Sequence, residues 1–169
     1  MPSSTYAGLI ESGKFSVFYL DIALAWSHGQ SQFDVFDGYS STFSYYEQMY
    51  TAQGEMRKKL VDLIGNEPFH ANVLILERLE ILPKFRGRRF GIAILKTMIE
   101  RFGAGAGIAA LKPYPLQFEM DLGPKDVAWK KELDLATFPK NQLRSTKALS
   151  KYYGRIGFKQ LSRTPFMFV

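Results

Sequence analysis

The chain has 169 residues, of which 46% are hydrophobic and 15% aromatic, so it can bury one core and we expect a single domain over residues 1–169. It has no cysteine, which excludes disulfides, thiolate metal sites and a cysteine nucleophile and is typical of a reducing cytoplasm. The net charge of +6 is compatible with nucleic acid, an acidic protein or a phosphorylated ligand as the partner.

Neither a secretion signal nor a membrane span is indicated. The start, residues 1–5, lacks the basic end and the apolar run of a signal peptide. The longest apolar run, about twelve residues from Phe15 to Trp26, contains Asp21 and is too short to cross a bilayer. We therefore expect a cytoplasmic protein with no membrane partner.

The first seventy residues predict one strand followed by helical segments. Apolar residues alternate over 14–26, which is typical of a strand. Ser40 or Ser41 can cap a helix that carries aromatic residues over 43–50 on one side. A second helical segment is expected over 56–64.

The centre of the chain is a strand, a basic turn and a helix. Residues 73–82 are apolar and rich in β-branched side chains, as expected of a buried strand. From Ile92 to Phe102, apolar residues recur at three- and four-residue spacing, which predicts a helix packed on a sheet.

The turn between them is too basic for an ordinary helix start, because cations are unfavourable at the positive end of a helix dipole. A bound anion would reverse that effect, and free backbone amides at a helix N-terminus donate readily to phosphate. The turn therefore predicts a diphosphate site. It contains Lys84, Arg86, Gly87, Arg88, Arg89 and Gly91.

The glycine-rich segment 103–107 follows a helix and precedes a strand predicted over 108–112, so we expect a helix end and a tight return there rather than a nucleotide loop. Beyond it, the pattern predicts a short helix over 127–133, a longer helix over 145–153, and two strands near 157–158 and 166–169. His28 and His70 lie far apart without a carboxylate cluster at ligand spacing, so we expect no metal site.

The strand, the proline and the basic glycine turn together resemble the acyl-CoA segment of the GNAT superfamily of N-acetyltransferases. Its signature is Arg/Gln-x-x-Gly-x-Gly/Ala, usually a few residues after a proline, and two registers fit. Counting from Pro83, the match starts at Arg86 and ends at Gly91, with Arg89 in the place of the first glycine. A match starting at Arg88 fits every letter but lies two residues later. The position of Pro83 favours the first register.

A second segment resembles the C-terminal Tyr-x-x-x-Gly-Phe element of the same superfamily. Tyr153 and Gly157-Phe158 fill those places, about sixty residues after the first motif. The resemblance covers roughly residues 72–168, and it implies an α/β fold (α+β type). That fold has a mixed, mainly antiparallel central sheet, helices on both faces, and a helix over 91–103 that crosses between two parallel strands.

The resemblance also implies where acetyl-CoA binds. The strands over 73–82 and 108–112 would splay apart at the acyl-CoA site and admit the pantetheine arm, which pairs with backbone near Ile81 and Leu82. A backbone amide there would stabilise the developing oxyanion. The implied cofactor-binding residues are Ile81, Leu82, Arg86, Gly87, Arg88, Arg89, Phe90 and Gly91.

The chemistry needs no covalent nucleophile, because an amine can attack a thioester directly when both are held together. By the resemblance, Tyr153 would donate a proton to the departing thiolate, which a phenol can do at neutral pH. Glu77 and Glu80 are both candidates for the base, and alternation along the strand places them on opposite faces. Each is equally compatible with an ion pair to Arg78.

We therefore expect an N-acetyltransferase that moves an acyl group, in the first instance acetyl, from CoA to an amine on a small molecule or a protein. One rival is a GNAT-like module that binds acyl-CoA without turnover, and another is a basic nucleic-acid-binding protein that uses residues 84–89. The acceptor, the acyl chain length and the choice between monomer and dimer remain open.

Overall fold

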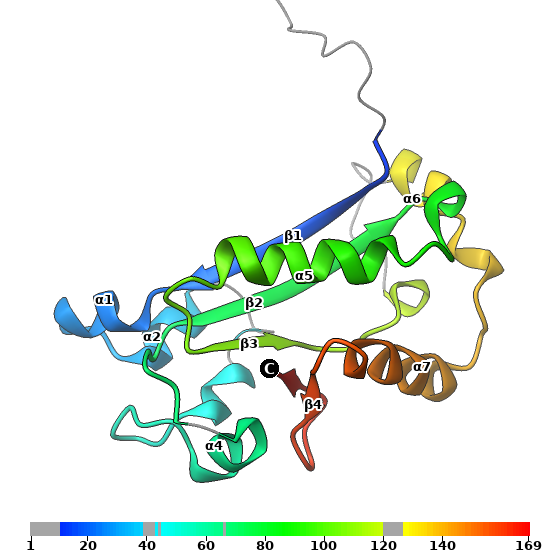
Figure 1. Ribbon diagram of the computed structural model, residues 1–169. Helices are drawn as coiled ribbons and strands as arrows, with labels where there is room; N and C mark the ends of the chain where they lie inside the picture. Colours follow the sequence, from blue (N-terminus) through cyan, green and yellow to red (C-terminus); the bar gives the residue numbers. More distant parts are fainter. Residues whose placement is uncertain (1–10, 39–42, 44, 66, 120–126) are drawn as a thin grey trace, which may run out of the picture.

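The computed structural model describes residues 11–38, 43, 45–65, 67–119 and 127–169, and within them the chain is built on a five-stranded open sheet (Figure 1). The strands run in the order β1 (Gly13–Leu20), β2 (Val73–Ile81), β3 (Ile108–Leu111), β5 (Met167–Phe168) and β4 (Lys159–Gln160). Strands β2 and β3 are parallel and the other neighbours are antiparallel. The prediction of a mixed, mainly antiparallel sheet in an α/β chain is therefore confirmed.

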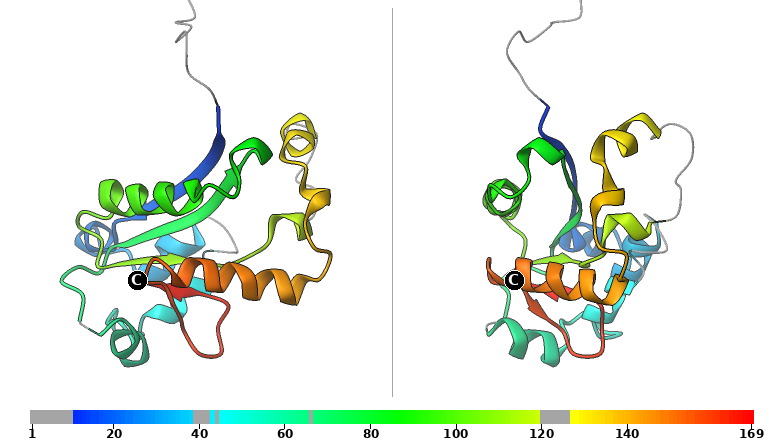
Figure 2. Two further views of the ribbon diagram at one scale, coloured as in Figure 1. Left: turned by 45° about the vertical axis from the view of Figure 1, so that its right-hand side comes forward. Right: turned by 90° about the vertical axis from the view of Figure 1, so that its right-hand side faces the viewer.

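One face of the sheet packs against α5 (Phe90–Phe102) and α7 (Gln142–Gly154), whose apolar side chains belong to one cluster; Figure 2 shows the two helices from two further directions. Leu95 of α5 and Phe158 just after α7 pack there against apolar side chains of β2, β3 and β5. Helix α5, which the sequence pattern predicts over 92–102, thus connects the two parallel strands β2 and β3, as expected.

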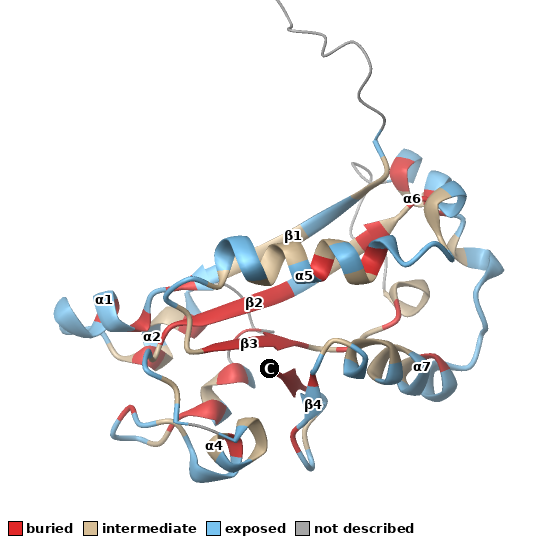
Figure 3. Cartoon of the chain, viewed as in Figure 1, coloured by how far each residue is buried: buried red, intermediate tan, exposed pale blue. Residues whose placement is uncertain are grey.

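The opposite face is covered by the segments between β1 and β2. They are α1 (Ile22–Ser27), α2 (Gln32–Asp37), the 3₁₀ turn η1 (Tyr45–Met49) and α4 (Lys58–Ile64). Their aromatic side chains form a core with Val73 and Ile75 of β2, and β2 and β3 are the most continuously buried part of the sheet (Figure 3). Helices on both faces are therefore confirmed.

The predicted strand over 14–26 is wrong beyond Leu20. The side chain of Asp21 accepts a hydrogen bond from the backbone N–H of Leu24 at 2.9 Å and so caps a new helix, α1. An N-cap satisfies backbone donors that a strand would pair with a neighbour. As a result Leu24 and Trp26, expected on a buried strand face, are largely exposed.

The remaining elements follow the predicted pattern with shifted ends, except that the helix expected over 43–50 is the 3₁₀ turn η1 and that α2 was not predicted. Ser40 and Ser41 lie outside the described residues, α4 ends at Gly65 in a left-handed conformation, and α6 (Val127–Leu133) has the predicted bounds. Helix α7 starts three residues early, because Asn141 accepts from the N–H of Arg144 at 2.9 Å. Short 3₁₀ turns are η2 (Pro83–Phe85), η3 (Leu116–Phe118) and η5 (Leu135–Thr137).

Replacing Asp21 by alanine tests the cap that ends β1. Loss of the side-chain acceptor should lower the free energy of unfolding by about 1 kcal/mol, measured by urea denaturation. Asp21→Asn is the matched control, since asparagine caps about as well, and it should unfold like the parent. Equal losses in the two variants would contradict the capping role.

Candidate active site

A cavity of about 850 Å³ lies where β2 and β3 part. The two strands pair only from Val73 to Ile75 on β2 and from Ile108 to Ala110 on β3, after which β2 continues alone beside β1. The cavity is lined by the second half of β2, the segment after β3, the start of α5 and the inner side of α7. It therefore joins the basic turn to the C-terminal motif, the two segments that carry the family resemblance.

The basic turn is held in its path by its own backbone conformation. Gly87 has φ +76°, which suits glycine, and Arg89 at the N-cap of α5 has φ +61°, which is uncommon for any other residue. The N-cap residue Arg89 makes no side-chain capping hydrogen bond, so the amides of Phe90 and Gly91 are left for other partners. Gly91 is buried, and a Cβ there would lie 2.4 Å from the Tyr152 hydroxyl. Glycine at 91 is thus required by packing inside the protein.

Arg86 does not present a free guanidinium. Its Nε donates to the Ile81 carbonyl at 2.8 Å, its Nη2 donates to the Leu133 carbonyl, and its charged head lies 4.6 Å from the centre of the Phe138 ring. Burial lowers its pKa, while Asp134 acts in the opposite direction. Arg86 therefore ties the end of β2 to α6.

The eight predicted cofactor-binding residues divide into two groups. Six of the eight line the cavity: Ile81, Arg86, Gly87, Arg89, Phe90 and Gly91. Leu82 and Arg88 lie outside its described lining, and the N–H of Leu82 donates to Ser12 on the β1 side at 3.0 Å. Because backbone groups alternate in an antiparallel pair, the N–H groups of Leu79 and Ile81 point away from β1.

A β-bulge lies at Glu77. Ser16 pairs with Arg78 and Val17 with Leu76, so Glu77 is an extra residue on β2. The bulge shifts the alternation: Leu76 and Leu79 both pack on the α5 side, although they are three positions apart and strict alternation would place them on opposite faces. Arg78 and Glu80 therefore face the other side.

The prediction that Glu77 and Glu80 lie on opposite faces assumes strict alternation along β2. That alternation does not hold between them, because Glu77 is the extra residue of the bulge.

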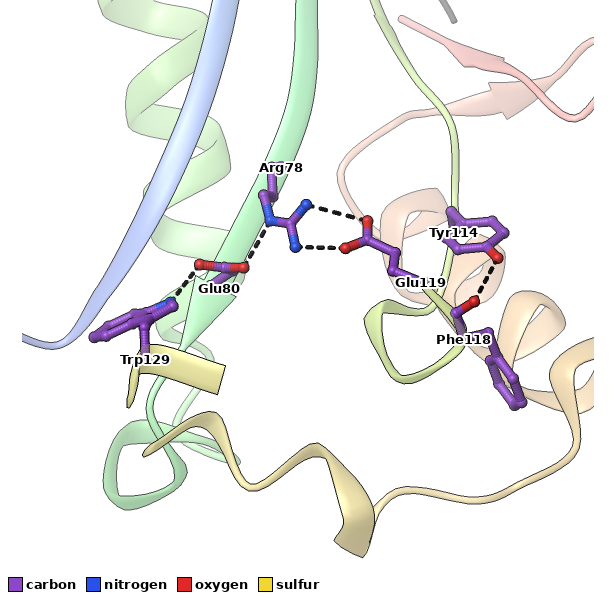
Figure 4. A network of polar contacts seen from close by, with 6 residues as sticks. All are labelled: Arg78, Glu80, Tyr114, Phe118, Glu119 and Trp129. Atoms are coloured by element: carbon purple, nitrogen blue, oxygen red, sulfur yellow. Dashed lines mark hydrogen bonds and ion pairs between the residues drawn. The ribbon is translucent and has the colours of Figure 1, made fainter. Parts of the chain in front are cut away.

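Glu80 is fixed on both oxygens (Figure 4). It is 5% exposed, accepts from Arg78 Nε at 2.6 Å, and accepts from the indole N–H of Trp129 at 2.5 Å. Arg78 also donates through both Nη atoms to Glu119, at 3.2 and 2.5 Å. This network joins β2 to α6 and to the segment after η3, which gives Glu80 a structural role.

Glu77 has the freer carboxylate of the two candidate bases. It is exposed at the cavity wall. Partial burial raises its pKa, Arg78 opposes the rise, and Glu119 adds to it. A carboxylate whose pKa is raised is a better proton acceptor near neutral pH than an ordinary one.

Tyr152 and Tyr153 both line the cavity from α7. Burial raises the pKa of Tyr153 to about 12, with a contribution from Tyr152, so its hydroxyl stays protonated at neutral pH. That hydroxyl makes no hydrogen bond with any residue that the structure describes, and it remains available to a ligand. The Tyr152 hydroxyl lies beside Gly91 and interacts with the backbone of Ile92.

The sequence offered Arg78 as an ion-pair partner, but it did not indicate Glu119 or Trp129, the other members of this network. Glu119 and Arg78 are 41 residues apart, and Trp129 and Glu80 are 49 apart. Within the described residues, no group of three or more His, Asp or Glu side chains could hold a metal ion, and no helix is long and apolar enough to cross a membrane.

Replacing Glu80 by alanine should lower the free energy of unfolding by about 2–4 kcal/mol, because it leaves the Trp129 N–H unpaired and Arg78 with one carboxylate fewer. Asp62→Ala is the control, since it breaks the exposed Lys58–Asp62 pair and should cost less than about 0.5 kcal/mol. Urea denaturation measures both. A Glu80→Ala variant as stable as the control would remove Glu80 from the structural network.

Comparison of this chain with family models, with curated proteins and with solved structures finds no match in any of the three.

Proposed function

We propose that this chain transfers an acyl group, in the first instance acetyl, from a CoA thioester to an amine. The observation that carries the proposal is the continuous cavity from the uncapped start of α5, past the parting of β2 and β3, to Glu77 on one side and Tyr153 on the other. The resemblance of both flanking segments to GNAT enzymes supports the same reading.

The start of α5 is the place for the diphosphate of CoA. The amides of Phe90 and Gly91 have no cap from a described side chain, and a helix N-terminus favours a negative group. Arg89 and Arg155 add positive charge to this part of the cavity wall. The Arg86 guanidinium, bound to two carbonyls, would act indirectly by holding the turn.

The exposed edge of β2 is the place for the pantetheine arm. The N–H of Ile81 points away from β1, while its carbonyl already accepts from Arg86. Hydrogen bonds from β2 to the pantetheine arm would therefore come mainly from the backbone N–H groups of Leu79 and Ile81, since the Ile81 carbonyl is already occupied. One of these amides would also stabilise negative charge on the thioester oxygen.

The reaction itself needs one bond to form, one bond to break and two protons to move. The amine nitrogen forms a bond to the thioester carbon, the carbon–sulfur bond breaks, and the sulfur leaves with the electron pair of that bond. The nitrogen loses a proton, which Glu77 would accept, since of the two described carboxylates that line the cavity Glu119 is already paired with Arg78. Tyr153 gives a proton to the thiolate and regains one from solvent.

The proposal predicts that acetyl-CoA and CoA raise the melting temperature, whereas NAD and ATP do so weakly. At a hundred times the dissociation constant, linkage adds about 2.7 kcal/mol, which is roughly 5–10 °C for a chain of this size. Differential scanning fluorimetry measures the shift. The absence of a shift at millimolar acetyl-CoA would contradict the acyl-transfer proposal. If a shift is present, a panel of amine acceptors is tested for release of free CoA, which distinguishes turnover from binding alone.

Two neighbouring arginines provide a matched control for that experiment. Arg89 lines the cavity and Arg88 does not, and both are exposed. Arg89→Glu should weaken acetyl-CoA binding by about tenfold or more, while Arg88→Glu should change it by less than about threefold. Equal effects would mean that the arginines act only through the overall charge of the chain.

Replacing Tyr153 by phenylalanine should lower kcat by about 10²-fold or more and leave acetyl-CoA affinity almost unchanged, because a proton donor to the leaving group acts mainly in the transition state. Single-turnover kinetics and the melting temperature are measured on the same variant. A parent-like kcat would remove Tyr153 from the mechanism. Tyr152→Phe is the comparison, and its turnover should fall far less.

A further inference from the structure

Part of the cavity runs between α5 and the sheet. Five apolar side chains line this part, which we call the apolar branch: Phe15 and Val17 of β1, Leu79 of β2, and Ile94 and Met98 of α5. Phe15 lies opposite Leu79 in the β1–β2 register, and opposite residues of an antiparallel pair share one face. Val17, Leu79 and Met98 pack against the cluster on the α5 face. The branch therefore extends from the free edge of β2, under α5, to the edge strand β1.

The contact between α5 and the sheet is open along this branch. An amphipathic helix normally buries the apolar side chains that face a sheet. On α5, only Gly91 and Leu95 are buried. Ile94 and Met98 are half-buried, and Phe15 on the sheet is 49% exposed. The branch is therefore apolar surface that no described part of the chain covers, and covering it with an apolar group is favourable.

The branch carries no charge of its own. Within the described lining of the cavity, β1 and α5 contribute no charged side chain. Every charged residue of that lining belongs to β2 at or next to the bulge, to the basic turn, to the segment after β3, or to α7 and its C-cap. A polar group would lose its hydration in the branch without gaining a partner, so the branch fits a hydrocarbon.

Leu79 connects the branch to the place proposed for the thioester. Its N–H points away from β1 and is one of the two amides proposed for the thioester oxygen, while its side chain lies in the branch. Tyr153, the proposed proton donor to the thiolate, packs against the same apolar cluster as Leu79 and Met98. A chain attached to the thioester carbon therefore starts at the entrance to the branch.

The dimensions of the branch suit a short hydrocarbon chain. Neighbouring strands are about 4.8 Å apart, so a path across β2 and β1 is about 10 Å long. Because C–C bonds are about 1.5 Å long, roughly six to eight carbons of an extended chain cover that path. A peptide helix, about 10 Å wide, does not fit beneath α5, which already packs on the sheet through Leu95. An acetyl group would leave most of the branch empty.

We propose that the apolar branch binds the acyl chain of the cosubstrate, and that the preferred acyl group is a straight chain of roughly six to eight carbons. This inference rests on the proposed acyl transfer and names the acyl group that the site takes. The bonds made and broken are unchanged: the amine nitrogen bonds to the carbonyl carbon at the head of the chain, and the thiolate leaves with the electron pair. Val17, Leu79 and Met98 determine specificity and are not catalytic residues.

Isothermal titration with CoA and with acetyl-, hexanoyl-, octanoyl- and dodecanoyl-CoA tests the chain length. Each fully buried methylene raises affinity about fourfold. We expect octanoyl-CoA to bind about thirtyfold or more tightly than acetyl-CoA, with no further gain for dodecanoyl-CoA, whose last carbons would pass the edge of β1. An affinity that does not rise from acetyl to octanoyl overturns the proposal. So does an affinity that rises equally steeply up to dodecanoyl, because it would indicate adsorption without a branch of defined length.

Two phenylalanine variants separate the branch from general surface hydrophobicity. Phe15 and Phe102 are 49% and 44% exposed, and Phe102 is absent from the described lining of the cavity. Phe15→Ala should weaken octanoyl-CoA about three- to tenfold and leave acetyl-CoA unchanged. Phe102→Ala is the matched control and should bind both like the parent. Equal effects of the two variants on octanoyl-CoA overturn the proposal.

Val17→Trp tests the branch in the opposite direction, by filling it. The variant should lose the preference for octanoyl-CoA and keep acetyl-CoA affinity within about threefold of the parent. Its melting temperature without ligand shows whether it folds, and Phe15→Ala decides the question if it does not. A folded Val17→Trp that keeps the full octanoyl preference overturns the proposal.

The titrations with CoA and acetyl-CoA judge the proposed function separately. If both bind and octanoyl-CoA binds no more tightly, the branch is not an acyl site and acyl transfer stands. If CoA, acetyl-CoA and octanoyl-CoA all fail to bind, acyl transfer fails, and the inference about chain length fails with it.

Discussion

The separation of β2 from β3 after three paired residues is the constraint on which the rest of the site depends. A strand inside a sheet normally has both of its edges satisfied, and buried backbone polar groups rarely lack partners. Beyond Ile75, β1 is the only described strand that pairs with β2, so one edge of the β2 backbone faces the cavity. Arg86 satisfies the Ile81 carbonyl, and the N–H groups of Leu79 and Ile81 have no partner among the described residues.

The parted strands are held by long side chains that bridge them. Arg78 reaches from β2 to Glu119 beyond η3, while Trp129 on α6 binds the other end of the same network through Glu80. These contacts define the wall of the cavity away from α5. Near the start of α5, Arg86 of the basic turn donates to carbonyls of both β2 and α6 and so holds these two elements together. The cavity is thus framed by ion pairs and by charged groups bound to carbonyls.

The sequence predicts the parts of this arrangement that depend on local pattern. Strand β2, helix α5 and helix α6 come from periodicity and capping, and the glycine turn comes from its own residue types. The end of β1 was not predicted, because apolar spacing over 14–26 fits a strand and the single side chain of Asp21 decides otherwise. The sequence signal for this helix start is Asp21 itself, because aspartate is a preferred N-cap residue.

The bulge and the polar network could not be predicted in the same way. Register is a property of two paired strands, and nothing within residues 73–81 alone marks Glu77 as the extra residue. The pairing of Arg78 with Glu119 joins residues far apart in the chain. The site is therefore predicted at its basic turn, while the polar network along its opposite wall is seen only in the folded chain.

The bulge gives β2 one residue more than its pairing with β1 requires. Another side chain at 77 would leave the pairing of Ser16 with Arg78 in place. Deleting Glu77 would restore simple alternation and keep Leu76 and Leu79 toward α5, with Arg78 and Glu80 still on the opposite face. Related sequences should therefore accommodate the loss of a single residue at this point of the strand without exchanging its two faces.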